Sequence, residues 1–360
     1  MSIIKKAFGK APCGCETDLY ILTNASGASV EISNFGGIIR AINVPDKSGK
    51  IGNVVLGYNS VEGYTPLHGY LGALIGRVGN RIAHGECELN GEKLTLFKNE
   101  ADRTHLHGGE IGFDRKIWDV TAVEGICEDF LMLKYTSADG EEGYPGTLKV
   151  QVTYTWTDEN ELVLRYEAVS DKDTLCNLTN HCYFNLEGEA SGLTVLDHTF
   201  EINADTFTVG DADLIPTGEQ RDVTGTNFDF RKPTVLRDVI AKMDEDDQLK
   251  AGNGVDHNFN VNDPEVGLRF ASEIIAPQSG RVMNVFTDQY AVQLYAGCWL
   301  KGVNPGSCGR VYDTYEGFCQ ETQLPPDSIN HENFPEAVLY AGEKYDYTTV
   351  FSFDVVEDAE

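Results

Sequence analysis

The sequence lacks any long run of apolar residues. No window approaches the ~20 consecutive apolar residues that a transmembrane helix requires. Residues 1–10 include basic side chains but are not followed by the apolar stretch of a signal peptide. We therefore expect a cytoplasmic protein that neither enters nor binds a membrane.

Positive charge is also scarce. The chain has 28 lysine and arginine residues against 57 aspartate and glutamate residues, which gives a formal net charge of −29. Such a surface repels phosphate backbones and anionic lipid, so it argues against nucleic acid and membrane surfaces as partners. A neutral small molecule would be indifferent to this charge.

Clusters of cysteine are missing as well. The nine cysteines are scattered through the chain, and only Cys13 and Cys15 lie close together. Two thiols one residue apart are too few for a metal site without a second pair. We therefore expect free thiols in a reducing compartment.

Helical periodicity is almost absent, since only residues 234–243 and 332–339 predict short helices. Apolar and polar residues instead alternate, most clearly over residues 147–156 and again over residues 162–168, after a polar turn. The chain has 37 glycines, many short predicted strands and no linker. Residues 1–360 are thus expected to form one all-β domain, a large antiparallel sandwich or barrel.

One predicted strand, residues 178–186, has an unusual polar face. Successive side chains of a strand point to opposite sides, and here one side is mostly apolar: Leu178, Cys182, Phe184 and Leu186. The opposite side carries Thr179, His181, Tyr183 and Asn185. Four polar positions in a row are typical of the floor of a polar pocket. Taken alone, His181 could equally be an ordinary histidine bonded to a neighbouring carbonyl.

Histidines also occur in the segment His105-Leu-His107-Gly-Gly. In an extended segment both imidazoles would face the same side, so a zinc site with a distant third ligand is one interpretation. No carboxylate or cysteine stands at helpful spacing, however, and one histidine of such a pair is often structural. A metal-dependent hydrolase using His105, His107 and His181 therefore stays open as an alternative.

Further polar residues recur in short motifs along the chain. They are Asn80 and Arg81, Asp256 to Asn258, Gln293 with Tyr295, and Glu321 with Gln323. Amide, carboxylate, guanidinium and imidazole groups together are the set that binds the hydroxyls of a neutral sugar, while aromatic rings such as Tyr183 and Tyr295 cover its apolar face. A non-catalytic sugar-binding module could use the same residues.

In these motifs the chain resembles the aldose 1-epimerases of the galactose mutarotase family. Seven motifs in the right order carry the resemblance: Gly76-Arg77 with Asn80-Arg81-Ile82, Leu106-His107-Gly108-Gly109, Thr179-Asn180-His181 with Tyr183 to Leu186, Asp256 to Phe259, Gln293 with Tyr295, Glu321-Thr322-Gln323 with Pro326-Asp327, and Asn330 with Phe334-Pro335. The resemblance implies a large antiparallel β-sandwich, the galactose mutarotase-like supersandwich, with few short helices.

The resemblance also implies an activity, the interconversion of the α and β anomers of free hexoses such as galactose and glucose. It assigns Glu321 as general base, His181 as general acid and His107 as a second histidine at the reacting centre. The residues that would bind the sugar are Arg81, Asn80, Asp256, Gln293 and Tyr183. No cofactor and no metal are expected, and the protein would be a monomer or a homodimer.

The expected chemistry is ring opening, rotation about the bond between the first two carbons, and re-closure. A carboxylate removes the proton of the anomeric hydroxyl while a protonated imidazole gives one to the ring oxygen. We expect a bell-shaped pH profile with Glu321 on its acidic limb and His181 on its basic limb. Relatives that act on sugar phosphates would need more cations than Arg77 and Arg81.

Overall fold

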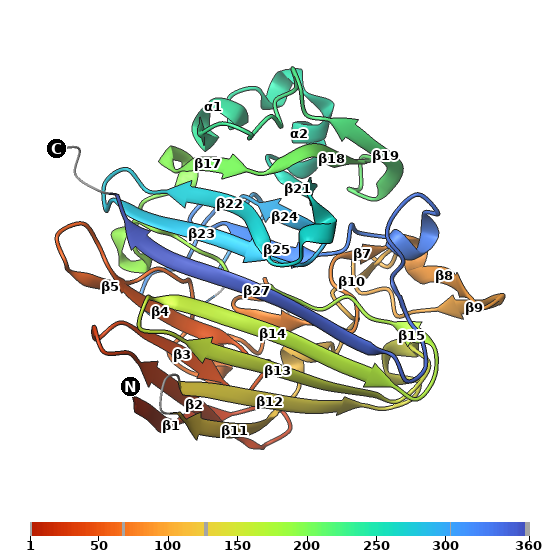
Figure 1. Ribbon diagram of the computed structural model, residues 1–360, viewed down its shortest axis with the longest axis horizontal. Coiled ribbons are helices and arrows are strands. Elements are labelled where there is room, and N and C mark those ends of the chain that lie inside the picture. The colour runs from red at the N-terminus through yellow and green to blue at the C-terminus, as the bar shows by residue number, and fades with distance from the viewer. Residues whose placement is uncertain (1, 67–68, 126–128, 303, 357–360) are drawn as a thin grey trace.

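The computed structural model describes residues 2–66, 69–125, 129–302 and 304–356. Its largest sheet has nine strands, and all of its strand pairs are antiparallel. In spatial order they are β11 (Asp119–Glu124), β12 (Asp129–Ser137), β13 (Leu148–Trp156), β14 (Glu161–Ser170), β27 (Lys344–Val355), β23 (Arg281–Thr287), β22 (Arg269–Ile275), β17 (Thr199–Ile202) and β20 (Thr234–Val235). Figure 1 shows this sheet crossing the molecule.

Two five-stranded antiparallel sheets pack against the large one. The first follows chain order: β1 (Ser2–Lys10), β2 (Glu16–Thr23), β3 (Ser29–Ser33), β4 (Ile39–Pro45) and β5 (Ile51–Asn53). The second has the order β19 (Pro216–Asp222), β18 (Ala204–Gly210), β21 (Asp256–Val261), β24 (Ala291–Tyr295) and β25 (Cys319–Gln323). Side chains from all three sheets share one buried core, so the predicted antiparallel β-sandwich is confirmed.

The alternation that predicted strands also explains the packing. Along β13 the residues from Leu148 to Trp156 alternate between buried and more exposed positions, and Tyr154 lies opposite Leu164 of β14. Burying one aliphatic or aromatic side chain contributes ~1.5–3 kcal/mol. The buried row of β13 therefore fixes which face of the sheet meets the core, because a slip of one residue would expose it.

Four two-stranded pairs complete the described strands. They are β7 (Arg81–Ile82) with β10 (His105–Leu106), β6 (Ala73–Ile75) with β16 (Thr179–His181), β15 (Thr174–Leu175) with β26 (Val338–Leu339), and β8 (Glu86–Leu89) with β9 (Glu92–Thr95). The first two pairs carry predicted site residues. The strand predicted over residues 178–186 is thus shorter than expected, although the whole segment is buried.

Helices are few and short. The α-helices are α1 (Leu236–Ile240) and α2 (Asp247–Gly252). Short 3₁₀ turns occupy Val61–Gly63, Ala83–Gly85, Phe113–Arg115, Glu141–Gly143, Glu189–Ser191, Val195–Asp197, Met243–Glu245, Pro264–Val266 and Ser328–Asn330. No helix of the described residues is long and apolar enough to cross a bilayer. Residues 234–243 do contain α1, but the helix predicted over residues 332–339 is wrong.

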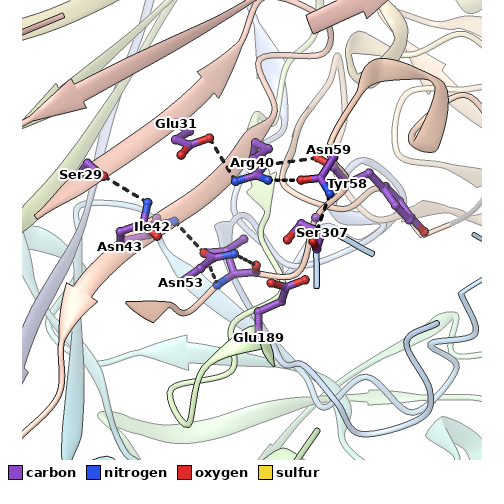
Figure 2. A network of polar contacts seen from close by, with 12 residues as sticks. Ser29, Glu31, Arg40, Ile42, Asn43, Asn53, Tyr58, Asn59, Glu189 and Ser307 are labelled. Atoms are coloured by element: carbon purple, nitrogen blue, oxygen red, sulfur yellow. Dashed lines mark hydrogen bonds and ion pairs between the residues drawn. The ribbon is translucent and has the colours of Figure 1, made fainter. Parts of the chain in front are cut away.

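A polar network ties the first sheet to a loop far along the chain (Figure 2). Arg40 of β4 donates to Glu31 of β3 at 3.1 Å, to the carbonyl of Tyr58 at 3.3 Å, and to the side chain of Asn59. The amide of Asn59 in turn donates to the carbonyl of Ser307 at 3.1 Å. The network thus fixes the backbone of Tyr58, whose ring lines the cavity described next.

Candidate active site

A cavity of about 1180 Å³ opens beside the second five-stranded sheet, which contains β21 and β25. Seven of the eight predicted site residues line it: Asn80, Arg81, His107, His181, Tyr183, Asp256 and Glu321. The eighth, Gln293, lies one strand away from Glu321, since the two residues are paired across β24 and β25. The structure therefore brings together side chains that are up to 241 positions apart in the sequence.

Glu321 and His181 face each other in this cavity. Glu321 Oε1 lies 3.7 Å from His181 Nε2, and both side chains are almost fully buried. Glu321 Oε2 has no hydrogen-bond partner among the described residues. On the far side of the ring, His181 Nδ1 lies 3.4 Å from the thiol sulfur of Cys319. The pair is thus positioned to exchange protons with a ligand, and one carboxylate oxygen of Glu321 is free to accept a hydrogen bond from that ligand.

Burial controls the ionisation of this pair. It raises the pKa of Glu321 well above the ordinary value, an effect that the nearby Asp256 adds to and Arg81 opposes. Burial likewise lowers the pKa of His181 to about 4. Desolvation therefore favours the form of the pair in which Glu321 is protonated and His181 is neutral. These shifts run against the expected assignment of the pH limbs, because desolvation reverses the ordinary order of the two pKa values.

His107 reaches the same cavity from the end of β10. Its backbone has a left-handed φ of 51°, and its Nδ1 accepts a hydrogen bond from the backbone N–H of Asn80 at 3.1 Å. In the neutral ring this places the proton on Nε2. Burial first, and then His181 and Arg81, hold the pKa of His107 well below its usual value. His107 is accordingly a neutral hydrogen-bond donor, and its ring centre lies 5.1 Å from that of His181.

Arg81 enters the cavity from β7 with a carboxylate partner. Glu100 accepts from Arg81 Nε at 2.9 Å and from Nη2 at 2.8 Å. Burial opposes the charge of Arg81, but Asp256, Glu100 and Glu321 together raise its pKa above the ordinary value. Sequence reasoning did not identify Glu100, because nothing in the local pattern distinguishes it from other surface carboxylates.

The remaining predicted residues form a second polar wall. Gln293 donates from Nε2 to Asp256 Oδ1 at 2.7 Å, and burial raises the pKa of Asp256. Tyr183 closes the wall, with its ring centre 5.0 Å from that of His181 and 5.8 Å from that of Tyr295. The wall thus combines acceptors for hydroxyl groups with aromatic surface.

Comparison with known proteins places the chain in a family. A family model described as aldose 1-epimerase matches residues 18–352. The chain belongs to the aldose 1-epimerase family. It is 42% identical to the galactose mutarotase of Homo sapiens over 98% of this chain and 99% of that protein. It is 33% identical to an aldose 1-epimerase of Escherichia coli (strain K12), over 95% of this chain and 97% of that protein.

A solved structure of the same family agrees with the fold. The galactose 1-epimerase of Lactobacillus acidophilus NCFM superposes with a TM-score of 0.85 at 29% identity, covering 99% of this chain and all of that one. The antiparallel sandwich inferred from alternation is thus also the fold of this galactose 1-epimerase.

Two residues of this aldose 1-epimerase lie outside the cavity although the sequence singled them out. Both ring nitrogens of His105 are occupied, one by the carbonyl of Phe97 at 2.7 Å and the other by the hydroxyl of Tyr144 at 2.5 Å. Because His107 has a left-handed backbone, the two histidines do not share a face. The zinc site with His105 as a ligand is therefore wrong.

Arg77 is the second such residue. It is buried, and its guanidinium donates only to neutral acceptors in the described chain: the Ser137 and Thr174 hydroxyls and the carbonyls of Ser137, Ala138, Pro145 and Gly146. Arg77 thus holds loops together and is not available to a ligand.

A different set of residues could hold a metal. His107, His181 and Glu321 offer ligand atoms that all lie within 4.8 Å of one another. Two imidazoles and a carboxylate can bind zinc, but the same three groups are also those that a proton-transfer mechanism needs. The absence of a metal requirement stays a prediction, which chelation would test.

Proposed function

We propose that Glu321 and His181 carry the interconversion of α and β hexose anomers that this epimerase catalyses. The observation that supports them is their buried 3.7 Å approach, with one oxygen of Glu321 left without a partner. A sugar placed against the two groups would meet a base and an acid on the same face.

The reaction needs one proton on the pair of Glu321 and His181, and this proton changes its position during the reaction. Glu321 accepts the proton of the anomeric hydroxyl while His181 gives a proton to the ring oxygen, and the ring opens. After rotation about the bond between the first two carbons, Glu321 returns a proton to the aldehyde oxygen and His181 takes one from the ring hydroxyl. Each group is acid in one direction and base in the other, so the enzyme is regenerated.

The direction of the pKa shifts fits a pair that shares a proton. With the proton on Glu321 and His181 neutral, the buried pair carries no net or separated charge, which is the form that desolvation favours. Transfer of this proton to His181 prepares ring opening, and its return accompanies closure. Positioned acid–base groups contribute on the order of 10²–10⁴-fold each.

The surrounding polar residues would hold the sugar. We assign Arg81, Asn80, Asp256 and Gln293 to sugar hydroxyls, His107 to a developing charge on oxygen through its Nε2–H, and Tyr183 to the apolar face. The names of the relatives support free galactose as a substrate, and glucose differs from it at a single hydroxyl. We further propose that residues 1–360 act as one domain in the cytoplasm, as a monomer or homodimer.

Glu321→Gln tests this proposal directly. The amide keeps the shape of the side chain but has no useful proton affinity, so exchange between anomers should fall at least 10²-fold. Exchange spectroscopy on galactose and glucose measures the rate, and a binding titration of the same sugars should show that they still bind.

The matched control is Glu332→Gln, since Glu332 is exposed and its side chain makes no hydrogen bond or ion pair with described residues. It should exchange anomers at the wild-type rate. A Glu321→Gln protein that exchanges anomers at a near wild-type rate would refute the role of Glu321.

A further inference from the structure

Glu100 makes an unusually complete contact with Arg81. The two hydrogen bonds of 2.9 and 2.8 Å join both carboxylate oxygens to the Nε and Nη2 donors, which is the planar, two-point geometry that arginine favours. The Nη1 group of Arg81 makes no hydrogen bond to any described residue. Two of its three nitrogens are thus fixed, and the third remains available in the cavity.

The loop that presents Glu100 is itself held in place. Glu100 and Thr104 exchange two backbone hydrogen bonds of 3.1 and 3.2 Å. The preceding residue, Asn99, donates to the carbonyls of Leu106 and Gly109 and accepts from the Leu106 N–H. This bonding links Glu100 to the strand pair that carries Arg81 and His107, so the ion pair is built into the site.

We propose that Glu100 is a positioning residue that orients Arg81 so that its Nη1 group binds one sugar hydroxyl. The proposal rests on the proposed function, because it takes Arg81 as a sugar-binding residue. A guanidinium without this anchor would rotate about four side-chain torsions and would pay conformational entropy to meet the sugar. Glu100 removes that cost before the sugar arrives.

The expected signature is a rise in KM with little change in kcat. A hydroxyl held equally in the ground and transition states contributes to binding alone. Glu100→Gln replaces one acceptor oxygen by a donor, so only one of the two bonds to Arg81 can persist. We expect KM to rise about 3–10-fold, from the typical net worth of one hydrogen bond, while kcat stays within about twofold.

Four variants separate this proposal from the role of Arg81 itself: Glu100→Gln, Arg81→Gln, the double variant, and Glu110→Gln as control. Glu110 is an exposed glutamate whose side chain makes no hydrogen bond or ion pair with a described residue. If Glu100 acts through Arg81, the double variant should bind sugar no worse than Arg81→Gln alone. Glu110→Gln should match the wild type.

Monodeoxy hexoses give a second readout, which would not change if Glu100 had only a structural role. The sugar that lacks the hydroxyl bound by Arg81 should lose its sensitivity to Arg81→Gln and to Glu100→Gln together. The proposal for Glu100 would be refuted if the effects of the two single substitutions on KM multiplied in the double variant. It would also be refuted if Glu100→Gln had the wild-type KM while Arg81→Gln was impaired. An Arg81→Gln protein with wild-type KM would instead refute the sugar-binding role of Arg81.

A second, independent feature lies at the tip of the first hairpin. The turn between β1 and β2 reads Ala11-Pro12-Cys13-Gly14-Cys15, and it is closed by the bonds Ala11 N–H to Cys15 O at 2.9 Å and Gly14 N–H to Ala11 O at 2.8 Å. Gly14 has a φ of 83°, and a Cβ built on it would meet nothing within 4 Å. The turn is therefore open to solvent between two fixed strands.

The two cysteines of this turn differ from the others. Of the eight cysteines described, Cys13 and Cys15 are exposed, Cys308 is intermediate and the rest are buried; Cys127 lies outside the described residues. A hydrogen bond between the two side chains lowers the pKa of Cys13 and raises that of Cys15. Burial, by contrast, raises the pKa of the Cys87 thiol to about 11.

We infer that Cys13 and Cys15 form a dithiol site that a low-molecular-weight disulfide oxidises reversibly. The Cys13 thiolate attacks one sulfur of the small disulfide and releases a thiolate. Cys15 then loses its proton, attacks the Cys13 sulfur and releases the second thiolate. One disulfide is reduced to two thiols while one disulfide bond forms between Cys13 and Cys15. The Cα atoms of these two residues can be at most ~7 Å apart, which is close to the span of a disulfide.

Intact-mass measurement in glutathione and glutathione disulfide buffers tests this site. The native chain should lose the mass of two hydrogens and bind no glutathione. Cys15→Ser should instead gain one glutathione, and Cys308→Ser should behave as the wild type. Stable attachment of glutathione to both thiols of the wild type, or absence of reaction in glutathione disulfide alone, would refute the dithiol site.

Discussion

At the scale of single residues, the same physical effect acts on Glu321 and His181, the two groups proposed to exchange protons. Desolvation penalises the charged form of each, so it raises the pKa of Glu321 and lowers that of His181 to about 4. Both the doubly protonated and the fully deprotonated pair are inactive in the mechanism above. The pH range of activity is therefore the range in which the pair holds a single proton.

The first prediction concerns that pH range. As pH falls, the second proton goes to His181, so kcat/KM should decline as pH falls toward about 4. As pH rises, the single proton is lost from Glu321, so the basic limb should lie well above the ordinary pKa of a glutamate. A pH profile of kcat/KM in the free enzyme measures both limbs.

Asp256→Asn provides the control for this assignment. The charge of Asp256 raises the pKa of Glu321, so its removal should shift the basic limb to lower pH and leave the acidic limb in place. A basic limb that stays fixed in this variant would contradict the assignment of that limb to Glu321.

The second prediction separates binding from catalysis at Gln293. Gln293→Ala removes the 2.7 Å bond to Asp256 and one proposed bond to the sugar, but it leaves the proton-transfer pair intact. We expect the affinity for hexoses to fall by about 0.5–1.5 kcal/mol, with a smaller change in kcat. Titration and exchange spectroscopy measure the two quantities.

Gln278→Ala is a suitable control because its side chain is exposed. A Gln293→Ala protein that binds sugar normally but turns over hundreds of times more slowly would show that Gln293 takes part in the chemistry.

The third prediction concerns metal dependence. His107, His181 and Glu321 lie close enough to bind an ion, yet the proposed reaction uses only protons. Exhaustive chelation followed by dialysis should leave anomer exchange unchanged, as measured by polarimetry. Loss of activity that zinc restores would favour a metal centre at these three residues.

At the scale of elements, the short helix α2 depends on one capping residue. Asp246 accepts from the backbone N–H groups of Gln248 at 2.9 Å and Leu249 at 3.2 Å. The helix then presents Gln248, whose side chain exchanges two hydrogen bonds with the backbone of Gly210. Asp246 thereby stabilises part of the cavity wall, since Gln248 and Gly210 both line it.

The fourth prediction is that Asp246→Ala destabilises the protein. Loss of an N-terminal cap typically costs about 0.5–2 kcal/mol. Chemical denaturation measures the change in the free energy of unfolding. Asp244→Ala is the matched control, because Asp244 is exposed and makes no hydrogen bond to described residues; it should leave stability unchanged. Equal stability of both variants would contradict the capping role.

The same elements show what could be read from the sequence. Alternation correctly predicted β13 and β14 because each has one buried face. The helix predicted over residues 332–339 failed because Pro335 cannot donate a helical hydrogen bond. The acidic composition of residues 244–247 likewise gives no sign that Asp246 caps α2.

The site could be predicted only in part, for a similar reason. Motif resemblance identified the eight site residues, seven of which line the cavity. It could not reveal that Glu100 pairs with Arg81, or that the backbone turns at His107 and separates it from His105. Both facts depend on contacts and backbone angles that no local pattern of residue types encodes.

At the scale of the whole molecule, the net charge of −29 has separate effects on stability and on activity. Like charges repel within the folded chain, and salt screens this repulsion over a Debye length that falls from ~30 Å at 0.01 M to ~10 Å at 0.1 M. A neutral hexose has no net charge for this field to attract or repel.

The fifth prediction follows from that difference. Raising sodium chloride from about 0.01 to 0.2 M should raise the melting temperature by a few degrees, while kcat/KM for galactose stays within about twofold. Calorimetry and exchange spectroscopy measure the two responses. Replacing the exposed Glu88 and Glu332 by lysine should weaken the response of the melting temperature, and a strong salt dependence of kcat/KM would argue for a charged substrate.

The position of β27 has a consequence for how the protein is made. This strand lies between β14 and β23 in the nine-stranded sheet, yet the ribosome makes it after both. From the synthesis of β23 to that of β27 about 60 residues must be added, which takes ~3–12 s at typical elongation rates. During that interval two strand edges have no partner, and open edges invite pairing with other nascent chains. Chaperone dependence should therefore be greatest while the last part of the sheet is being translated.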